Sequence, residues 1–169
     1  NLPLREGKGS VYEGGIRVPM IVSWAGKVAS GTKINTPVVV EDIFPTLLEM
    51  AEIKGYNTVQ KIDGQSLVST LTSKKPLDYS RPILQHFPHQ WRPEVNEDID
   101  YMTALRVGDW KLIYRHRPQT LELYNLTEDI GERNNLAKAN PEKLAEMAEV
   151  MTAELKAKSS FAYNLASAL

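Results

Sequence analysis

The sequence predicts an α+β fold: a buried strand and a helix, then an antiparallel sheet of three to four strands covered by a C-terminal helix. Two patterns support this prediction. Between residues 81 and 126, runs of aromatic and β-branched residues alternate with turn residues, as in antiparallel strands. Between residues 140 and 158, apolar residues recur at helical spacing. With 169 residues, the chain is long enough for one domain plus a subdomain around a buried core.

The first segment, residues 1–72, is expected to belong to a large domain. Residues 1–17 are rich in glycine and charge and indicate an irregular loop. "VPMIVSW" (18–24) is a short apolar run with β-branched residues, typical of a buried strand inside a parallel or mixed sheet. Residues 38–53 then change to a helical period. Asp42 is the expected N-cap, Pro45 fits the first turn, and an apolar face follows, made of Ile43, Phe44, Leu47, Leu48 and Ala51.

The second segment, residues 73–169, begins at a boundary that we place near Ser73. Strands are expected over residues 81–87, 101–116 and 120–126, and Gly108-Asp109 splits the middle run into a hairpin. The last helix is expected over 140–158, with a proline in its first position and one apolar stripe that packs on the sheet: Leu144, Met147, Met151 and Leu155.

Lys8 is the first candidate functional residue, because "GKGS" (7–10) sets it between two glycines. A nucleotide-binding P-loop does not fit, since it needs a glycine five residues before the lysine and Ser or Thr directly after it. Gly7 and Gly9 let a ligand approach the backbone, and the lysine offers three donors, which suits a tetrahedral oxyanion. From composition alone, a solvated loop lysine is the more frequent case.

A second candidate site lies in "QHFPHQWR" (85–92), which contains His86, His89, Trp91 and Arg92. These side chains could line a pocket for a polar, ring-shaped ligand, with the indole stacking and the other groups hydrogen bonding. The spacing is too irregular for a helical zinc site, and we predict no metal ligands in this chain. An ordinary surface loop explains the same residues equally well.

Composition excludes several classes of function. The formal net charge is −1, so the chain has no global attraction to nucleic acid or to an anionic membrane. No apolar run approaches the roughly 20 residues that span a bilayer. The absence of cysteine excludes disulfides and thiolate metal sites within this chain. The first residues have neither a signal core nor an initiator methionine, as in a mature form or a piece of a longer protein.

Together the motifs resemble the sulfatases, the arylsulfatase-type branch of the alkaline phosphatase superfamily. "PLREGKGSVYEGGIRVPMIVSWAGKV" (3–28) is similar to the segment that follows the active-site core in that family. Four further signatures follow in the family's order: "VEDIFPTLLEMAEI" (40–53), "DGQSL" (63–67), "ALRVGDWKLIY" (104–114) and "ELYNLTEDIGERNNLA" (122–137). The resemblance covers nearly the whole chain and implies the C-terminal part of an alkaline-phosphatase-like α/β fold.

The resemblance also implies a chemistry. Lys8 would contact the sulfate ester and neutralise charge on the sulfate oxygens and the leaving alkoxide. Sulfatases hydrolyse sulfate esters with a formylglycine, made in a C/S-x-P-x-R motif, and a divalent cation, usually Ca²⁺; this sequence lacks that motif. We therefore expect a C-terminal fragment that is inactive alone. The whole enzyme is expected to act on a sulfated carbohydrate, in the periplasm or outside the cell, or in the lysosome of a eukaryote.

Two alternatives stay open at this stage. The chain could belong to a phosphonate or phosphate monoester hydrolase of the same superfamily, or it could be a non-catalytic module that binds sulfated glycans.

A central strand at 18–24 needs neighbouring strands. The isolated chain is therefore expected to expose apolar surface or to form oligomers, because its natural partner would be the remainder of the sulfatase chain.

Overall fold

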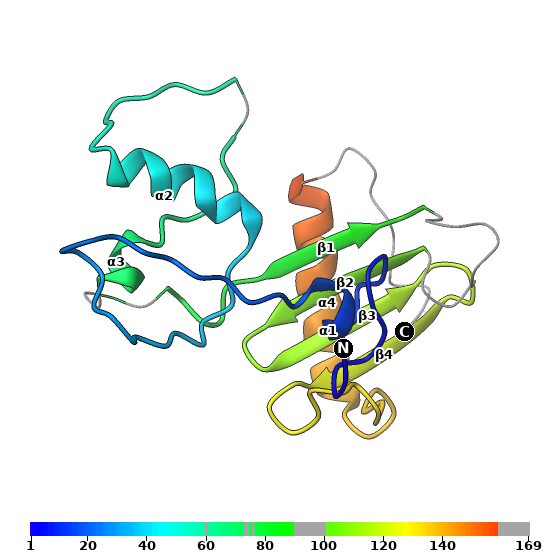
Figure 1. The fold of residues 1–169 in the computed structure, drawn as a ribbon. Helices are drawn as coiled ribbons and strands as arrows, with labels where there is room; N and C mark the ends of the chain where they lie inside the picture. The colour runs from blue at the N-terminus through cyan, green and yellow to red at the C-terminus, as the bar shows by residue number, and fades with distance from the viewer. Residues whose placement is uncertain (60, 73–74, 76, 90–100, 159–169) are drawn as a thin grey trace. The chain divides into compact units, whose positions relative to one another are not determined.

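The computed structural model describes residues 1–59, 61–72, 75, 77–89 and 101–158, and Figure 1 shows their arrangement. The chain forms two compact units, one made of Asn1–Pro19 together with the chain from Ser80 onward, the other of Met20–Tyr79. The domain boundary near Ser73 stays a prediction. The N-terminal loop lies in the same unit as the sheet, and each unit is described by itself below.

The first unit is built on a four-stranded antiparallel sheet whose strands follow the order β1-β2-β3-β4. The bounds are Ile83–Phe87 for β1, Met102–Val107 for β2, Trp110–Arg115 for β3 and Thr120–Asn125 for β4. Gly108 has φ = 59° in the two-residue loop between β2 and β3, where tight hairpins favour glycine. The predicted sheet and its hairpin are therefore confirmed.

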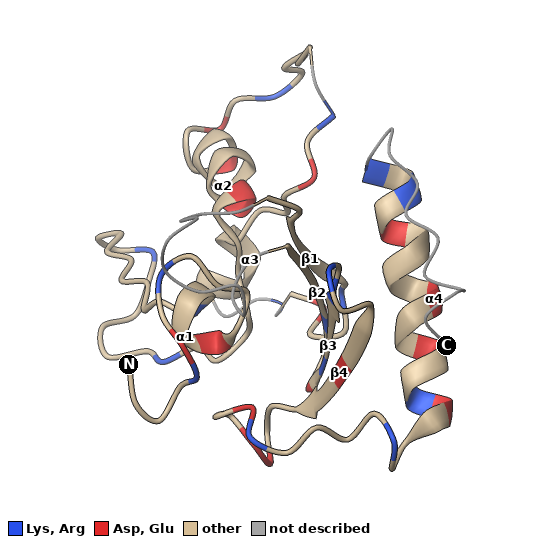
Figure 2. Ribbon diagram, turned by 90° about the vertical axis from the view of Figure 1, so that its right-hand side faces the viewer, with Lys and Arg blue, Asp and Glu red and all other residues tan. Residues whose placement is uncertain are grey.

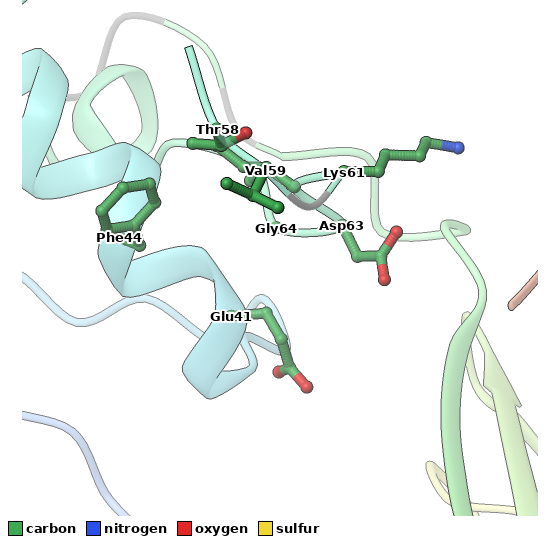
Figure 3. Close-up of a pocket in the computed structure, with 8 residues that line it drawn as sticks. Glu41, Phe44, Thr58, Val59, Lys61, Asp63 and Gly64 are labelled. Carbon is green, nitrogen blue, oxygen red and sulfur yellow. The ribbon is translucent and has the colours of Figure 1, made fainter. Parts of the chain in front are cut away.

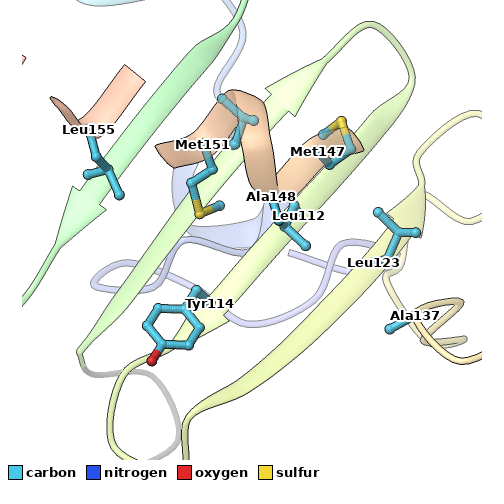
Figure 4. Close-up of a cluster of buried hydrophobic side chains, with 9 residues drawn as sticks. Leu112, Tyr114, Leu123, Ala137, Met147, Ala148, Met151 and Leu155 are labelled. Atoms are coloured by element: carbon cyan, nitrogen blue, oxygen red, sulfur yellow. The ribbon is translucent and has the colours of Figure 1, made fainter. Parts of the chain in front are cut away.

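Helix α4 (Pro141–Lys158) covers one face of this sheet (Figures 1 and 4). The predicted apolar stripe packs there, and three of its side chains are at most 1% exposed: Met147, Met151 and Leu155. They meet one leucine from each of the three strands β2, β3 and β4, namely Leu105, Leu112 and Leu123. Burial of these side chains is the main term that holds the helix on the sheet.

The N-terminal loop covers the opposite face. Val11 and Tyr12 are buried there against a second apolar cluster: Met102, Ala104, Ile113, Tyr124 and Leu126. The short helix α1 (Glu13–Ile16) follows directly, and Figure 2 shows α1 and α4 on opposite sides of the strands. The loop that carries Lys8 is thus part of the sheet's own packing.

The second unit contains a 3₁₀ turn, η1 (Val40–Asp42), and the helices α2 (Ile43–Met50) and α3 (Val68–Leu71). The expected helix is confirmed in position. The Asp42 carboxylate accepts the N–H groups of Val39 and Gln65, each at 2.9 Å, and so ties "DGQSL" to the helix start. A Cβ on Gly64 would lie 2.0 Å from the Glu41 carbonyl oxygen, so this contact requires glycine.

The apolar face of α2 is exposed rather than buried within this chain. Ile43, Phe44 and Leu47 are 43%, 49% and 56% exposed. Helical periodicity identifies which side chains form an apolar face but says nothing about which segment covers it.

The predicted buried strand at 18–24 is wrong for this chain. Residues 18–24 form no strand, and Val18 and Ile21 are 77% and 95% exposed. A strand exists only with a hydrogen-bonding neighbour, and no described segment pairs with this one. The apolar run therefore showed a preference for burial without showing the partner.

Within the described part of the chain, each helix is too short or too polar to cross a membrane.

Candidate functional site

Lys8 lies exposed on the loop that precedes α1, while the residues just after it turn into the core. The Ser10 N–H donates to the Gly7 carbonyl at 3.2 Å, and Gly9 has φ = 98°, so the chain reverses tightly around the lysine. Ser10 is already buried. Lys8 therefore lies at an exposed turn, and the chain becomes buried two residues later, at Ser10.

The glycine pair of "YEGG" closes this loop on itself. The Gly14 N–H donates to the Arg5 carbonyl at 2.8 Å. A Cβ on Gly14 would lie 2.3 Å from the Arg5 carbonyl oxygen, and a Cβ on Gly15 would lie 2.3 Å from that of Ser10. No side chain fits at such distances without moving the backbone, so the glycines allow two stretches of main chain to touch.

A buried charge cluster anchors the loop to the sheet. The Lys111 Nζ on β3 lies 2.9 Å from Glu13 Oε1 and 2.8 Å from Glu132 Oε1, with all three side chains at most 3% exposed. The Glu13 N–H also donates to Glu132 Oε2 at 2.7 Å. Burial raises the pKa of Glu132, and the Lys111 ammonium counteracts part of that rise. Sequence reasoning missed Lys111, because one lysine in an alternating strand resembles a solvent-facing residue.

A second polar network lies beside the first. Tyr12 and Tyr124 both donate to Glu122 Oε2, at 2.8 and 2.9 Å. The Arg5 guanidinium donates to the Tyr124 hydroxyl at 3.0 Å and lies 3.9 Å from the centre of the Tyr12 ring. Burial, followed by the Glu122 charge, raises the pKa of both tyrosines, so they remain protonated donors.

The structure places His86 away from Lys8. The His86 Nδ1 lies 2.8 Å from Thr103 Oγ1, which lies 2.8 Å from His116 Nε2. His86 lies opposite Thr103 in the sheet. Leu84 and Leu105, two residues away from them along their strands, pack with α4, so His86 and Thr103 lie on the α4 face. The Lys8 loop packs on the other face. The Thr103 hydroxyl has one proton, so one imidazole accepts it and the other donates an N–H.

The other three candidates of this loop have separate outcomes. His89 is exposed, and its ring lies 4.0 Å from that of Phe87, whose side chain packs with the cluster under the N-terminal loop. His86 therefore faces α4, whereas the His89 ring lies beside Phe87, which packs on the other face. Trp91 and Arg92 lie outside the described residues.

The neutral state of His116 predicts an acid-sensitive stability. Burial, together with the neighbouring His86, lowers the pKa of His116 to about 4 from 6.5. The unfolded chain takes up this proton below about pH 6.5, so stability is complete above that pH and falls between about 6.5 and 4. We expect urea unfolding to show a loss of about 1 kcal/mol at pH 5, discounted for partial exposure.

The matched variant for this prediction is His116→Gln, which has no titrating imidazole at this position. Its stability should change less between pH 7.5 and pH 5 than that of the wild type. An unchanged pH dependence in the variant would show that another group is responsible.

A separate pocket of about 580 Å³ lies within the second unit (Figure 3). Its walls include the Phe44 ring and Val59, together with the carboxylates of Glu41 and Asp63 and one lysine, Lys61. Two carboxylates against one ammonium disfavour an anion. Of these two places, the Lys8 loop is therefore the better candidate for an oxyanion.

The described residues contain no group of three or more His, Cys, Asp or Glu side chains that could hold a metal ion.

Comparison with known proteins gives one consistent result. Residues 7–160 match the family model described as N-sulphoglucosamine sulphohydrolase, C-terminal. A sulfatase of Formosa agariphila is 36% identical over 165 residues, covering 93% of this chain and 29% of that protein. An N-acetylgalactosamine-6-O-sulfatase of Bacteroides thetaiotaomicron is 31% identical over 157 residues, covering 87% of this chain and 29% of its own length.

The same relationship holds among solved structures. The structure of Ps i-CgsB in complex with k-i-k-neocarrahexaose superposes with a TM-score of 0.70 at 29% identity, covering 89% of this chain and 31% of that one. The chain therefore spans under a third of the length of these relatives.

Proposed function

We propose a function for this chain from its family: it belongs to the sulfatases, and it matches the C-terminal model of N-sulphoglucosamine sulphohydrolase. Its proposed role is to complete an enzyme that hydrolyses sulfate esters, by supplying one cationic wall of the catalytic pocket. The observation that carries this proposal is the Lys8 loop. Its lysine is exposed, and Glu13 at the end of the loop is bonded to Lys111 on the sheet.

Lys8 is the proposed catalytic residue of this chain. Its ammonium would donate to the non-bridging sulfate oxygens and to the leaving oxygen as the S–O bond breaks. Such a donor accelerates the reaction when it is already in place, because charge then develops next to a fixed cation. The backbone contacts of the loop support this proposal, because they hold the main chain on both sides of Lys8.

The nucleophile and the divalent cation are proposed to come from the rest of the enzyme. The chain has no C/S-x-P-x-R motif in which a formylglycine is made, and its described residues form no metal site. The family's formylglycine and Ca²⁺ therefore do not fit the described part of this chain.

A sulfated carbohydrate is the proposed substrate. One similar protein was solved in complex with a neocarrahexaose, and the name of one relative specifies an N-acetylgalactosamine sulfatase. His86, His89, Trp91 and Arg92 remain proposed substrate contacts. Of the two described, His89 is the more accessible to a ligand, because His86 is engaged by Thr103. The proposed compartment is the periplasm or the exterior, or the lysosome in a eukaryote.

The remainder of the sulfatase chain is the proposed partner of the exposed apolar residues. The uncovered face of α2 and the unpaired run at 18–24 both expose large apolar side chains. Without that partner, these surfaces favour association between copies of the chain.

The test is an assay of the full-length protein that contains this chain. We expect release of inorganic sulfate from an aryl sulfate, loss of that activity with a chelator, and slower hydrolysis of the matched aryl phosphate. Faster hydrolysis of a phosphate or phosphonate ester would assign the chain to that class instead. Tight, saturable binding of a sulfated disaccharide by this chain alone, without turnover by the full-length protein, would make it a binding module.

A further inference from the structure

We propose that Lys111 is a positioning residue for Lys8, acting through the buried carboxylates of Glu13 and Glu132. The inference rests on the proposed function, in which Lys8 contacts the sulfate. Lys111 lies on β3, on the face of the sheet that the N-terminal loop covers. Its side chain is fully buried and cannot itself reach a substrate, so its role in catalysis would be indirect.

Lys111 joins three separate segments of the chain. Its ammonium reaches Glu13 on α1, 98 residues earlier in the chain, and Glu132 on the turn after β4. Glu132 in turn accepts the Glu13 N–H, so Glu13 is held through both its side chain and its backbone. Because Glu13 lies five residues after Lys8, these contacts fix the end of the loop that presents the lysine.

The surrounding positive charges converge on Glu13. The Arg17 and Arg106 guanidinium groups lie 3.5 and 3.9 Å from Glu13 Oε2, while Lys111 occupies Oε1. Three cations therefore converge on one carboxylate. A buried ion pair is weak evidence for stability, because well-packed apolar side chains often serve that purpose as well or better. Such a cluster does define one loop position, since any displaced arrangement leaves buried charges without partners.

Glu132 has an uncommon backbone conformation. Its φ of 51° is the left-handed conformation, which is uncommon for residues other than glycine. The turn is held there by Asp129, whose carboxylate accepts the N–H groups of Arg133 and Asn134 at 2.7 and 2.8 Å. The Glu132 carbonyl also accepts a hydrogen bond from Arg5 at 3.0 Å, which ties the start of the Lys8 loop to the same turn.

The experiment is a double-mutant cycle in the full-length protein, with Lys111→Met and Lys8→Ala assayed singly and together on an aryl sulfate. We expect Lys111→Met to lower kcat/KM by about 10- to 100-fold, mostly through kcat, as for a misplaced catalytic group. In the Lys8→Ala background, the same change should lower kcat/KM less than about twofold, because the two residues act as one unit.

Three further variants keep the test decisive. Leu155→Ala removes a buried contact on the α4 face of the same unit. This variant should have a lower melting temperature and an unchanged kcat. Lys111→Arg keeps the charge and should recover part of kcat. If Lys111→Met does not fold, Glu13→Gln replaces it, because it removes one charge at nearly constant shape and should show the same dependence on Lys8.

The outcomes separate the two proposals. If the effects of the Lys111 and Lys8 substitutions multiply, or if Leu155→Ala lowers kcat equally, Lys111 contributes only stability and this inference is overturned. If Lys8→Ala leaves kcat/KM unchanged, the proposed role of Lys8 fails and the positioning role falls with it.

Discussion

Replacing Lys8 with alanine in the full-length protein is expected to lower kcat/KM for a sulfate ester by about 10²- to 10³-fold, the usual cost of removing one fixed transition-state donor. The physical reason is that negative charge develops on the leaving oxygen as the S–O bond breaks, and water replaces the fixed cation poorly. Most of the loss should appear in kcat, since the interaction strengthens in the transition state.

The stability of the Lys8→Ala variant serves as its internal control. Because Lys8 is exposed, the free energy of unfolding should stay within about 0.5 kcal/mol of the wild type. Lys156→Ala, which removes an exposed lysine from the last turn of α4, should leave both activity and stability unchanged. A Lys8→Ala enzyme with full activity would remove this residue from the catalytic site.

Replacing Gly15 with alanine is expected to destabilise the protein by about 3 kcal/mol, at the upper end for overpacked sites. The added Cβ would lie 2.3 Å from the Ser10 carbonyl oxygen and 2.6 Å from that of Gly7. Both are backbone atoms, so relief requires the loop to open. The opening would move Lys8, and kcat/KM should fall together with stability, as measured by urea unfolding and the aryl sulfate assay.

Gly7→Ala is the matched control on the same loop. A Cβ at that position would meet nothing nearer than the Asn1 side-chain nitrogen at 3.7 Å, which is ordinary van der Waals contact. Its free energy of unfolding should stay within about 0.5 kcal/mol of the wild type. Equal losses in the two variants would show that glycine is needed for some reason other than close backbone contact.

The sheet unit could be predicted from sequence because its signals are local. Strand alternation, the Gly108 turn and the stripe Met147, Met151 and Leu155 each depend on residues a few positions apart, and all three are confirmed. The antiparallel pairing of β2, β3 and β4 also follows from the short connections between them, at 108–109 and 116–119.

The anchoring of the candidate site could not be predicted, because its contacts are long-range. Lys111 meets Glu13 across 98 residues, and no local pattern marks either as buried. The run at 18–24 failed for a related reason, since its apolar residues lack a pairing partner among the described segments. The two flanking glycines made Lys8 a candidate, and only the resemblance to the family favoured it over a solvated loop lysine. The glycine pair at 14–15 has a steric reason that needs coordinates.

The position of residues 1–19 within the sheet unit has a consequence for biosynthesis. The chain leaves the ribosome from its N-terminus, so the Lys8 loop emerges long before β3 and β4, which it packs against. Contacts across such separations form late, because the intervening chain must first be closed into a loop. The loop therefore remains without its binding surface until β3 and β4 have been made. A nascent chain that stops before β4 would carry every residue of the glycine-lysine motif and still be unable to place it.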